Sequence, residues 1–371
     1  MTRLPVFVTR PLLPDPGELE PLLAEIFDSR ILTNRGPILQ RFESATAAWL
    51  GVEHVSLVSN ASLGLVLALR HLGITGEVIT SPFSFVATSH AIRWAGAEPV
   101  FADIDERTLN LDPAAVEARI TSRTQAILAV HCYGIPCDTV ALEEIARRHG
   151  LRVIYDAAHA FGVRQSGKPL AAAGDLSVLS FHATKVFNTF EGGAIVSPDR
   201  ETKLALDRLA NFGIVDDVTV TATGINAKMT ELSAAVGLTL LPKVAAAIAS
   251  RDRVAARYWH ALSGVRGLRC LCPPGQEGHN SYAFPVLVEP DYPLSRDELH
   301  HRLKAENIHA RRYFHPLISD LPMYRTLESA APQGLPVAQR AASRVLCLPL
   351  YHDLDPADQD RIIGLVSSPW A

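Results

Sequence analysis

The amino-acid sequence predicts an α/β fold, and two patterns carry this prediction. Seven apolar, strand-like runs recur between residues 55 and 197, and helical patterns separate most of them. Such alternation is typical of a largely parallel sheet that is covered by helices. Beyond residue 241 the pattern changes, which indicates a second, smaller α+β domain. The expected domains are therefore 1–241 and 242–371.

The predicted elements of the first domain follow in chain order. An irregular arm reaches about Pro16, a helical pattern begins at Gly17, and a second amphipathic segment follows the turn at 32–37. The expected strands are 55–59, 78–81, 100–103, 126–131, 153–157, 178–181 and 194–197. The helices expected between them are 63–72, 85–95, 113–120 and 140–149.

A long helical segment, 230–258, is rich in alanine and leucine and carries the chain into the second domain. Pro242 is expected to break this helix, because proline removes a backbone donor and clashes with the preceding turn. Further strands are expected at 281–288 and 347–349, and further helices at 296–306 and 356–366. The domain boundary is placed near Leu241.

Composition excludes several classes of protein. The chain has 371 residues, of which 48% are hydrophobic, so it is long enough for about two domains with substantial cores. Its 35 basic and 39 acidic residues form no block of like charge, which argues against nucleic acid as the main partner. Five cysteines match no zinc or redox spacing. With no signal peptide and no run of about 20 apolar residues, we expect a cytoplasmic protein that is not in a membrane.

Lys185 directly follows a predicted buried strand, in the stretch VLSFHATKVFNTFEGG at 178–193. An amine shielded from water loses part of its preference for the protonated form, so it can act as a nucleophile near neutral pH. A lysine that forms an imine requires this property. Taken alone, the pattern also fits an ordinary surface lysine, so the neighbouring motifs decide between the two interpretations.

Two more motifs end strands of the same predicted sheet. The turn at 59–62 joins a strand to a helix, where free amides, the helix dipole and a serine hydroxyl can bind an anion. Asp156 ends another strand, and His159 follows three positions later. A carboxylate there suits a charged ring nitrogen, and a metal is less favoured because only His159 stands nearby as a ligand. Plain helix caps would also explain each motif alone.

These three features complete one another. Asp156 precedes Lys185 by 29 positions (185 − 156), and each closes a strand of the same predicted sheet. An anion pocket, a carboxylate for a pyridinium nitrogen and an imine-forming lysine are what pyridoxal phosphate requires of a protein. We therefore predict pyridoxal 5'-phosphate as the cofactor, with no metal.

The motifs together resemble a known family. SFHATK followed by EGG, DAAHA, SNAS, GINAKMTE, VFADID, AVHCYG and CLPLY are similar to the DegT/DnrJ/EryC1 family of pyridoxal-phosphate sugar aminotransferases, over nearly the full length. The resemblance implies the type I, aspartate-aminotransferase-like fold with a mostly parallel seven-stranded sheet. Within the family, SFHATK and EGG look most like members that aminate a 4-keto nucleotide sugar, such as dTDP-4-keto-6-deoxyglucose. A 3-keto nucleotide sugar is the alternative substrate.

The resemblance also implies a role for individual residues. Lys185 would form the imine with the cofactor and then carry the proton, and Asp156 would pair with the pyridinium nitrogen. The other implied contacts to the cofactor are Ala61, Ser62 and Ser180 at the phosphate, Phe85 on a ring face, His159 near the ring hydroxyl, and Asn226 at the phosphate in the neighbouring subunit. The expected assembly is an obligate homodimer with shared active sites.

The chain departs from the family pattern at three places. Ala61-Ser62 stands where many members have glycine-threonine, and His159 replaces a common glutamine and is expected to be able to titrate near neutrality. Asn226-Ala227-Lys228 stands where asparagine-tyrosine-arginine is frequent. A lysine offers only a point charge where an arginine binds bidentately, so this change bears on the substrate or the donor.

The predicted reaction has two halves, in which L-glutamate gives its amino group to the cofactor and the keto sugar receives it. The sugar diphosphate needs cations, and the candidates by residue type are Lys228, Arg311, Arg312 and His315. A cofactor-binding regulatory protein without turnover is an alternative that Lys185 argues against. A nicotinamide dehydrogenase would need a G-x-G-x-x-G turn after the first strand, and residues 59–64 do not provide one.

Overall fold

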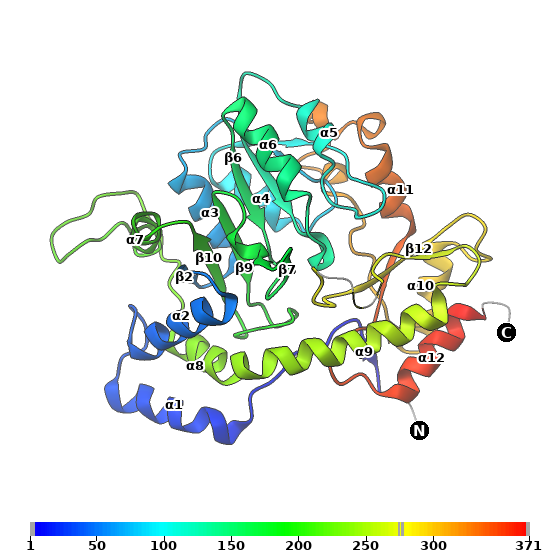
Figure 1. Ribbon diagram of the computed structural model, residues 1–371, viewed down its shortest axis with the longest axis horizontal. Coiled ribbons are helices and arrows are strands. Elements are labelled where there is room, and N and C mark those ends of the chain that lie inside the picture. The colour runs from blue at the N-terminus through cyan, green and yellow to red at the C-terminus, as the bar shows by residue number, and fades with distance from the viewer. Residues whose placement is uncertain (1–3, 274, 276–277, 369–371) are drawn as a thin grey trace.

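A computed structural model describes residues 4–273, 275 and 278–368. Its centre is a seven-stranded sheet (Figure 1). The strands lie in the spatial order β2 (His54–Val58), β10 (Gly193–Ser197), β9 (Leu176–Ser180), β6 (Arg152–Asp156), β5 (Thr124–Val130), β3 (Glu77–Thr80) and β4 (Glu98–Phe101). Within this sheet β10 is antiparallel to both of its neighbours, and the other pairs are parallel. The mostly parallel sheet is therefore confirmed.

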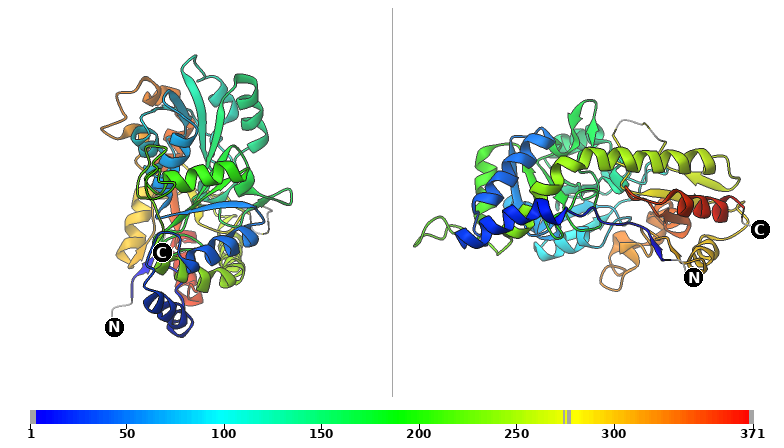
Figure 2. Two further views of the ribbon diagram at one scale, coloured as in Figure 1. Left: turned by 90° about the vertical axis from the view of Figure 1, so that its left-hand side faces the viewer. Right: turned by 90° about the horizontal axis from the view of Figure 1, so that it is seen from below.

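Helices cover both faces of this sheet. One face packs against α3 (Ala61–His71), α4 (Ala87–Trp94) and α7 (Arg200–Leu209). The other face packs against α1 (Pro16–Ser29), α2 (Pro37–Leu50) and α8 (Glu231–Leu240) at one end, and α5 (Pro113–Glu117) and α6 (Thr139–His149) at the other. A small hairpin, β7 (Arg164–Gln165) and β8 (Lys168–Pro169), stands apart from the sheet. The segment after α7 extends away from the body of the molecule (Figures 1 and 2).

The C-terminal part has its own antiparallel sheet in the order β11-β12-β14. Its strands are β11 (Leu268–Cys270), β12 (Phe284–Val288) and β14 (Val345–Leu348), and its helices are α9 (Val244–Leu262), α10 (Arg296–Ala305), α11 (Pro336–Arg344) and α12 (Pro356–Ser367). The N-terminal arm is not wholly irregular as expected, because β1 (Val6–Phe7) pairs in parallel with β13 (Ile308–His309). The arm thus pairs with the C-terminal part of the chain, whereas the domain boundary at Leu241 stays a prediction.

The helical segment Glu231–Leu262 runs across the base of the molecule (Figure 1). A 3₁₀ turn at Leu241–Lys243, which contains Pro242, separates α8 from α9 as the sequence predicted. By length and hydropathy alone this segment could cross a membrane, although Lys243 keeps its unbroken apolar run below the limit of about 20 residues used in the sequence prediction. Its apolar character has a packing reason, because α8 lies against α2 so closely that a side chain at Gly237 would collide with the Phe42 ring.

Candidate active site

A cavity of about 280 Å³ opens at the carboxyl ends of β2, β5, β6 and β9. The sheet brings together here seven of the residues that the sequence singled out, although they are up to 124 positions apart (185 − 61). The seven that line it are Ala61, Ser62, Phe85, Asp156, His159, Ser180 and Lys185. Because the carboxyl ends of the parallel strands lie at the same edge of the sheet, the turn at 59–62, Asp156 and Lys185 come together there.

Lys185 lies in the loop between β9 and β10, with its amine inside the protein. Burial lowers the pKa of this amine to about 8, and the opposing charge of Asp156 reverses only part of the effect. Its Nζ is 3.4 Å from the hydroxyl oxygen of Tyr282 and 5.0 Å from the centre of that ring. Roughly a tenth of this amine is therefore uncharged at pH 7, far more than for a lysine in water, and the uncharged form is the one that acts as a nucleophile or a base.

Asp156 is the last residue of β6 and is buried. The Thr88 hydroxyl donates to its Oδ2 at 2.8 Å, and the amide of Ala158 donates to its Oδ1 at 3.1 Å. Burial raises the pKa of Asp156 even though both hydrogen bonds favour the carboxylate. Among the residues that the structure describes, none forms an ion pair with Asp156, so its buried carboxylate is suited to a positively charged ligand atom in the cavity.

His159 is buried and held as a neutral ring. The amide of Tyr133 donates to its Nδ1 at 3.1 Å, so the proton of the neutral imidazole lies on Nε2. Burial, with a smaller effect of the Lys185 charge, holds the pKa of His159 well below its usual value. The expectation that this histidine titrates near neutrality is therefore wrong, because its ring has lost the water that would stabilise the charged form.

The anion end of the cavity is the start of α3. The Asn60 side chain accepts the amide of Leu63 at 2.9 Å, whereas the preceding amides of Ala61 and Ser62 have no acceptor inside the helix. The backbone of β10 approaches closely, since a Cβ at Gly193 would lie 2.8 Å from the Ala61 nitrogen. Glycine at this position leaves the helix start open to a negatively charged group.

Comparisons with known proteins agree with this geometry. The model of the DegT/DnrJ/EryC1/StrS aminotransferase family matches residues 17–367. The chain belongs to this family. It is 48% identical to a dTDP-4-amino-4,6-dideoxy-D-glucose transaminase of Escherichia coli, over 94% of each protein, and 46% identical to one of Shigella dysenteriae, over 98% of each. The crystal structure of DesI, determined in the presence of its TDP-sugar product, superposes with a TM-score of 0.93 at 39% identity, covering 98% of this chain and 93% of that one.

Membership of the DegT/DnrJ/EryC1/StrS family confirms the predicted enzyme class, the type I fold and pyridoxal 5'-phosphate as the cofactor. The cavity fits this group on its own evidence. Asp156 offers a buried carboxylate for the ring nitrogen, Lys185 offers an amine whose pKa is lowered, and the start of α3 offers free amides for the phosphate. Within the described residues no cluster of three metal-ligating side chains occurs.

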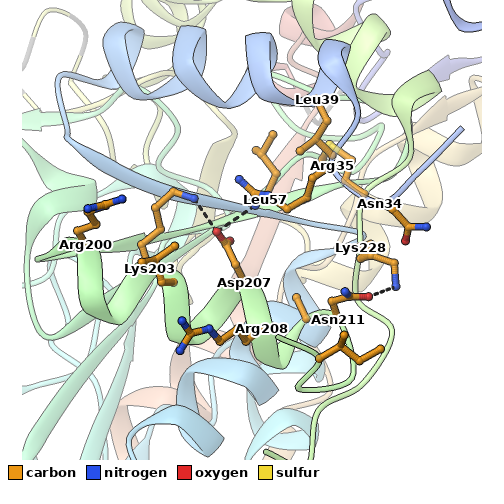
Figure 3. Close-up of a pocket in the computed structure, with 14 residues that line it drawn as sticks. Asn34, Arg35, Leu39, Leu57, Arg200, Lys203, Asp207, Arg208, Asn211 and Lys228 are labelled. Carbon is orange, nitrogen blue, oxygen red and sulfur yellow. Dashed lines mark hydrogen bonds and ion pairs between the residues drawn. The ribbon is translucent and has the colours of Figure 1, made fainter. Parts of the chain in front are cut away.

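Five of the predicted residues lie outside the cavity that contains Lys185. Asn226 is exposed along a neighbouring groove of about 710 Å³, which Ser62 and Phe85 also line. Lys228 lies in a separate cavity beside α7, where its amine donates to Asn211 at 2.9 Å (Figure 3). Arg312 and His315 line a third cavity of about 350 Å³.

The third cavity is adjacent to that of Lys185. Tyr313 lines both of them, so it forms part of a shared wall. Arg311 also lines the third cavity, and Arg312 forms an ion pair of 2.8 Å with Asp297. Arg311 and Arg312 therefore lie close to the cavity of Lys185, although they do not line it.

Sequence reasoning missed several residues of this site. Thr88, which donates to Asp156, stands only three positions after Phe85, and its place in FSFVAT was an available signal. Tyr282 is 97 positions from Lys185 and lies just before β12, so no local pattern connects the two. Phe314 and Tyr313 complete the wall of the cavity.

Proposed function

We propose that this enzyme transfers the amino group of L-glutamate to dTDP-4-keto-6-deoxy-D-glucose and forms dTDP-4-amino-4,6-dideoxy-D-glucose. The observation that carries the proposal is the cavity in which the Lys185 amine, the Asp156 carboxylate and the start of α3 converge. The names of the two transaminases at 46–48% identity, and the TDP-sugar product present with DesI, support the choice of sugar.

The chain's own residues would hold the cofactor in a defined orientation. Asp156 would pair with the ring nitrogen, and the Nε2 proton of His159 would face the ring hydroxyl. The amides at the start of α3, with the Ser62 and Ser180 hydroxyls, would hold the phosphate. Once bound, pyridoxal phosphate supplies an electron sink for the carbanion that forms when the donor loses a proton.

Lys185 moves the proton in both halves of the proposed reaction. In the first half its uncharged amine would take the proton from the α-carbon of glutamate and pass it to the bound cofactor. In the second half the same amine would take a proton back and give it to C4 of the sugar. A pKa of about 8 suits both steps, because it lies within about one unit of neutral pH and both forms of the amine are therefore populated.

We further propose a cytoplasmic homodimer in which each site uses residues of both subunits. The groove of about 710 Å³ exposes 61% of Phe85 and 81% of Trp94, which is unusual for large apolar side chains on a monomer. A second copy that covers the groove would bring its Asn226 to the cofactor phosphate of its partner. Lys228, Arg312 and His315 remain the candidates for the sugar diphosphate.

The test is to incubate the purified protein with L-glutamate and a panel of dTDP-linked 4-keto and 3-keto sugars. We expect 2-oxoglutarate and a 4-amino sugar from the 4-keto substrate, identified by mass spectrometry and NMR. Consumption of the 3-keto sugar instead would correct the position of amination. If no sugar accepts the amino group, the substrate class is wrong.

A further inference from the structure

Tyr282 brings a hydroxyl group to the reacting atom of the site. Its Oη lies 3.4 Å from Lys185 Nζ and, within the described residues, is the only hydrogen-bond partner of this amine. We propose that Tyr282 is a further catalytic residue, whose hydroxyl oxygen accepts a hydrogen bond from Lys185 each time the amine takes up a proton. The inference rests on the transamination proposed above.

Two anchors on opposite sides hold the Tyr282 backbone. The guanidinium of Arg251, which is buried in α9, donates to the carbonyls of Ser281 and Tyr282 at 3.3 Å each. The Tyr282 amide donates to Asn280 at 3.1 Å, and the Asn280 amide group donates to the His159 carbonyl at 2.9 Å. The hydroxyl is therefore positioned relative to both α9 and the loop after β6.

The Tyr282 ring is fixed as well. It stacks on the ring of His159, with a centroid distance of 4.1 Å and an interplanar angle of 11°. Because His159 stays neutral, this contact places no charge beside the amine of Lys185. The face of Tyr282 also lies within cation–π range of Nζ, so both the ring and its oxygen favour the ammonium form.

The proton balance assigns one task to Tyr282. In each half-reaction Nζ would take up one proton and give it up again: from the α-carbon of glutamate to the bound cofactor in the first half, and from the cofactor to the sugar carbon in the second. Lys185 is therefore charged for part of each half-reaction. Burial raises the pKa of Tyr282, so the phenol keeps its own proton throughout. The phenol oxygen therefore stabilises the charged amine by accepting a hydrogen bond, and no proton is transferred to it.

Tyr282→Phe tests this role, because it removes the oxygen and keeps the ring that stacks on His159. Tyr292→Phe is the matched control, since that hydroxyl donates to the Val366 carbonyl at 2.6 Å and lies outside the cavity. Each full-length variant is first freed of cofactor. Pyridoxal phosphate is then added, and its covalent attachment to Lys185 is followed by absorbance as a function of pH. Without the hydroxyl oxygen as acceptor the Lys185 ammonium is less stable, so the midpoint pH of attachment should fall by roughly one unit in Tyr282→Phe.

A second measurement uses the holoenzyme. Exchange of the α-proton of glutamate in D₂O, followed by NMR, should slow roughly ten- to hundredfold in Tyr282→Phe and stay near the parent rate in the control.

An unchanged midpoint pH of attachment in Tyr282→Phe, or an equal shift in the control, would overturn the proposal. The proposal would also be overturned if Tyr282→Phe melted at the same temperature as the parent but attached no cofactor at any pH, because Tyr282 would then be needed for cofactor binding. A parent that attaches cofactor but exchanges no proton would contradict glutamate as donor, and the midpoint would still decide the role of Tyr282.

Discussion

Two hydroxyl groups connect Asp156 to the wall of its cavity. Ser84 and Thr88 are 2.9 Å apart, and Thr88 donates onward to Asp156 at 2.8 Å. All three side chains are buried, so water cannot replace a missing donor at low cost. Thr88 is therefore a positioning residue, which fixes the direction in which the carboxylate faces the cavity.

Substitutions at Thr88 test whether its hydrogen bond to Asp156 or the packing of its methyl group matters for activity. Thr88→Val keeps the shape and removes the donor, and we expect kcat to fall roughly tenfold because Asp156 loses its fixed direction. Thr88→Ser keeps the donor and should restore most of the parent rate. The measurement is kcat together with the dissociation constant of the cofactor. Equal losses in the valine and serine variants would show that the methyl group matters and the hydrogen bond does not.

Site residues that belong to a local sequence motif can be predicted from the sequence, whereas residues that a distant segment brings to the site cannot. Lys185 and Asp156 could be predicted because each follows a strand and carries a charge that burial makes reactive. The neutrality of His159 could not, because it depends on the Tyr133 amide and on the desolvation of the folded site. Tyr282 carries no local signal, since only the approach of the loop before β12 brings it to Lys185.

Helix α2 depends on a side chain from another helix. Its N-cap is Gly36, which has no side chain to accept the first amides. The buried Glu231 of α8 accepts the amides of Ile38 at 2.9 Å and Leu39 at 3.2 Å instead. A Cβ at Gly36 would lie 2.7 Å from the Glu231 carboxyl carbon, so glycine is required for this approach.

Removing this distant cap should destabilise the protein. Glu231→Ala leaves two buried amides without an acceptor, and we expect the free energy of unfolding to fall by about 2–4 kcal/mol. Glu231→Gln keeps one acceptor oxygen and should lose less. Urea unfolding of the cofactor-free protein measures both. An alanine variant within about 0.5 kcal/mol of the parent would show that water caps α2 instead.

The elements themselves are largely determined by local pattern. All seven strands of the sheet lie within two residues of their predicted bounds, because their apolar runs are short and bounded by polar turns. Helix α7 was not predicted, since its charged sequence buries only Leu206, although Asp199 caps it by accepting the amide of Thr202. The two-residue β1 could not be predicted, because it exists only through pairing with residues about 300 positions away.

Acid stability is a property of the whole molecule, to which three buried histidines contribute. Burial lowers the pKa of His131 to about 3 and that of His279 to about 4, and the pKa of His159 also lies well below its usual value. Below pH 6.5 the unfolded chain binds protons at these positions and the folded chain does not. The stability that these three histidines contribute is therefore fully present above about pH 6.5 and is lost as the pH falls towards 4, by up to about 4 kcal/mol per pH unit.

Replacing one histidine measures its share of this loss. The amide of Cys137 donates to Nδ1 of His131 at 3.0 Å, and an asparagine oxygen can accept the same bond without titrating. We expect His131→Asn to be less stable than the parent at pH 7, with a difference that shrinks by roughly 1 kcal/mol per pH unit between pH 6 and 5. Urea unfolding at three pH values provides the data. A constant difference would mean that His131 is protonated in the folded protein.

The sharing of active sites between subunits can be decided by mixing two inactive variants. Lys185→Ala removes the reacting amine, and Asn226→Ala removes a side chain that faces the groove rather than the cavity of its own chain. If Asn226 serves the partner, a mixed dimer contains one site in which both residues are intact, and the other site carries both lesions. Random reassociation makes half of the dimers mixed, so the mixture should recover about a quarter of the parent activity.

If each subunit instead completed its own site, every site in a mixed dimer would carry one substitution and mixing would restore no activity. Mixing each variant with itself provides the baseline, and size-exclusion chromatography shows that reassociation has occurred.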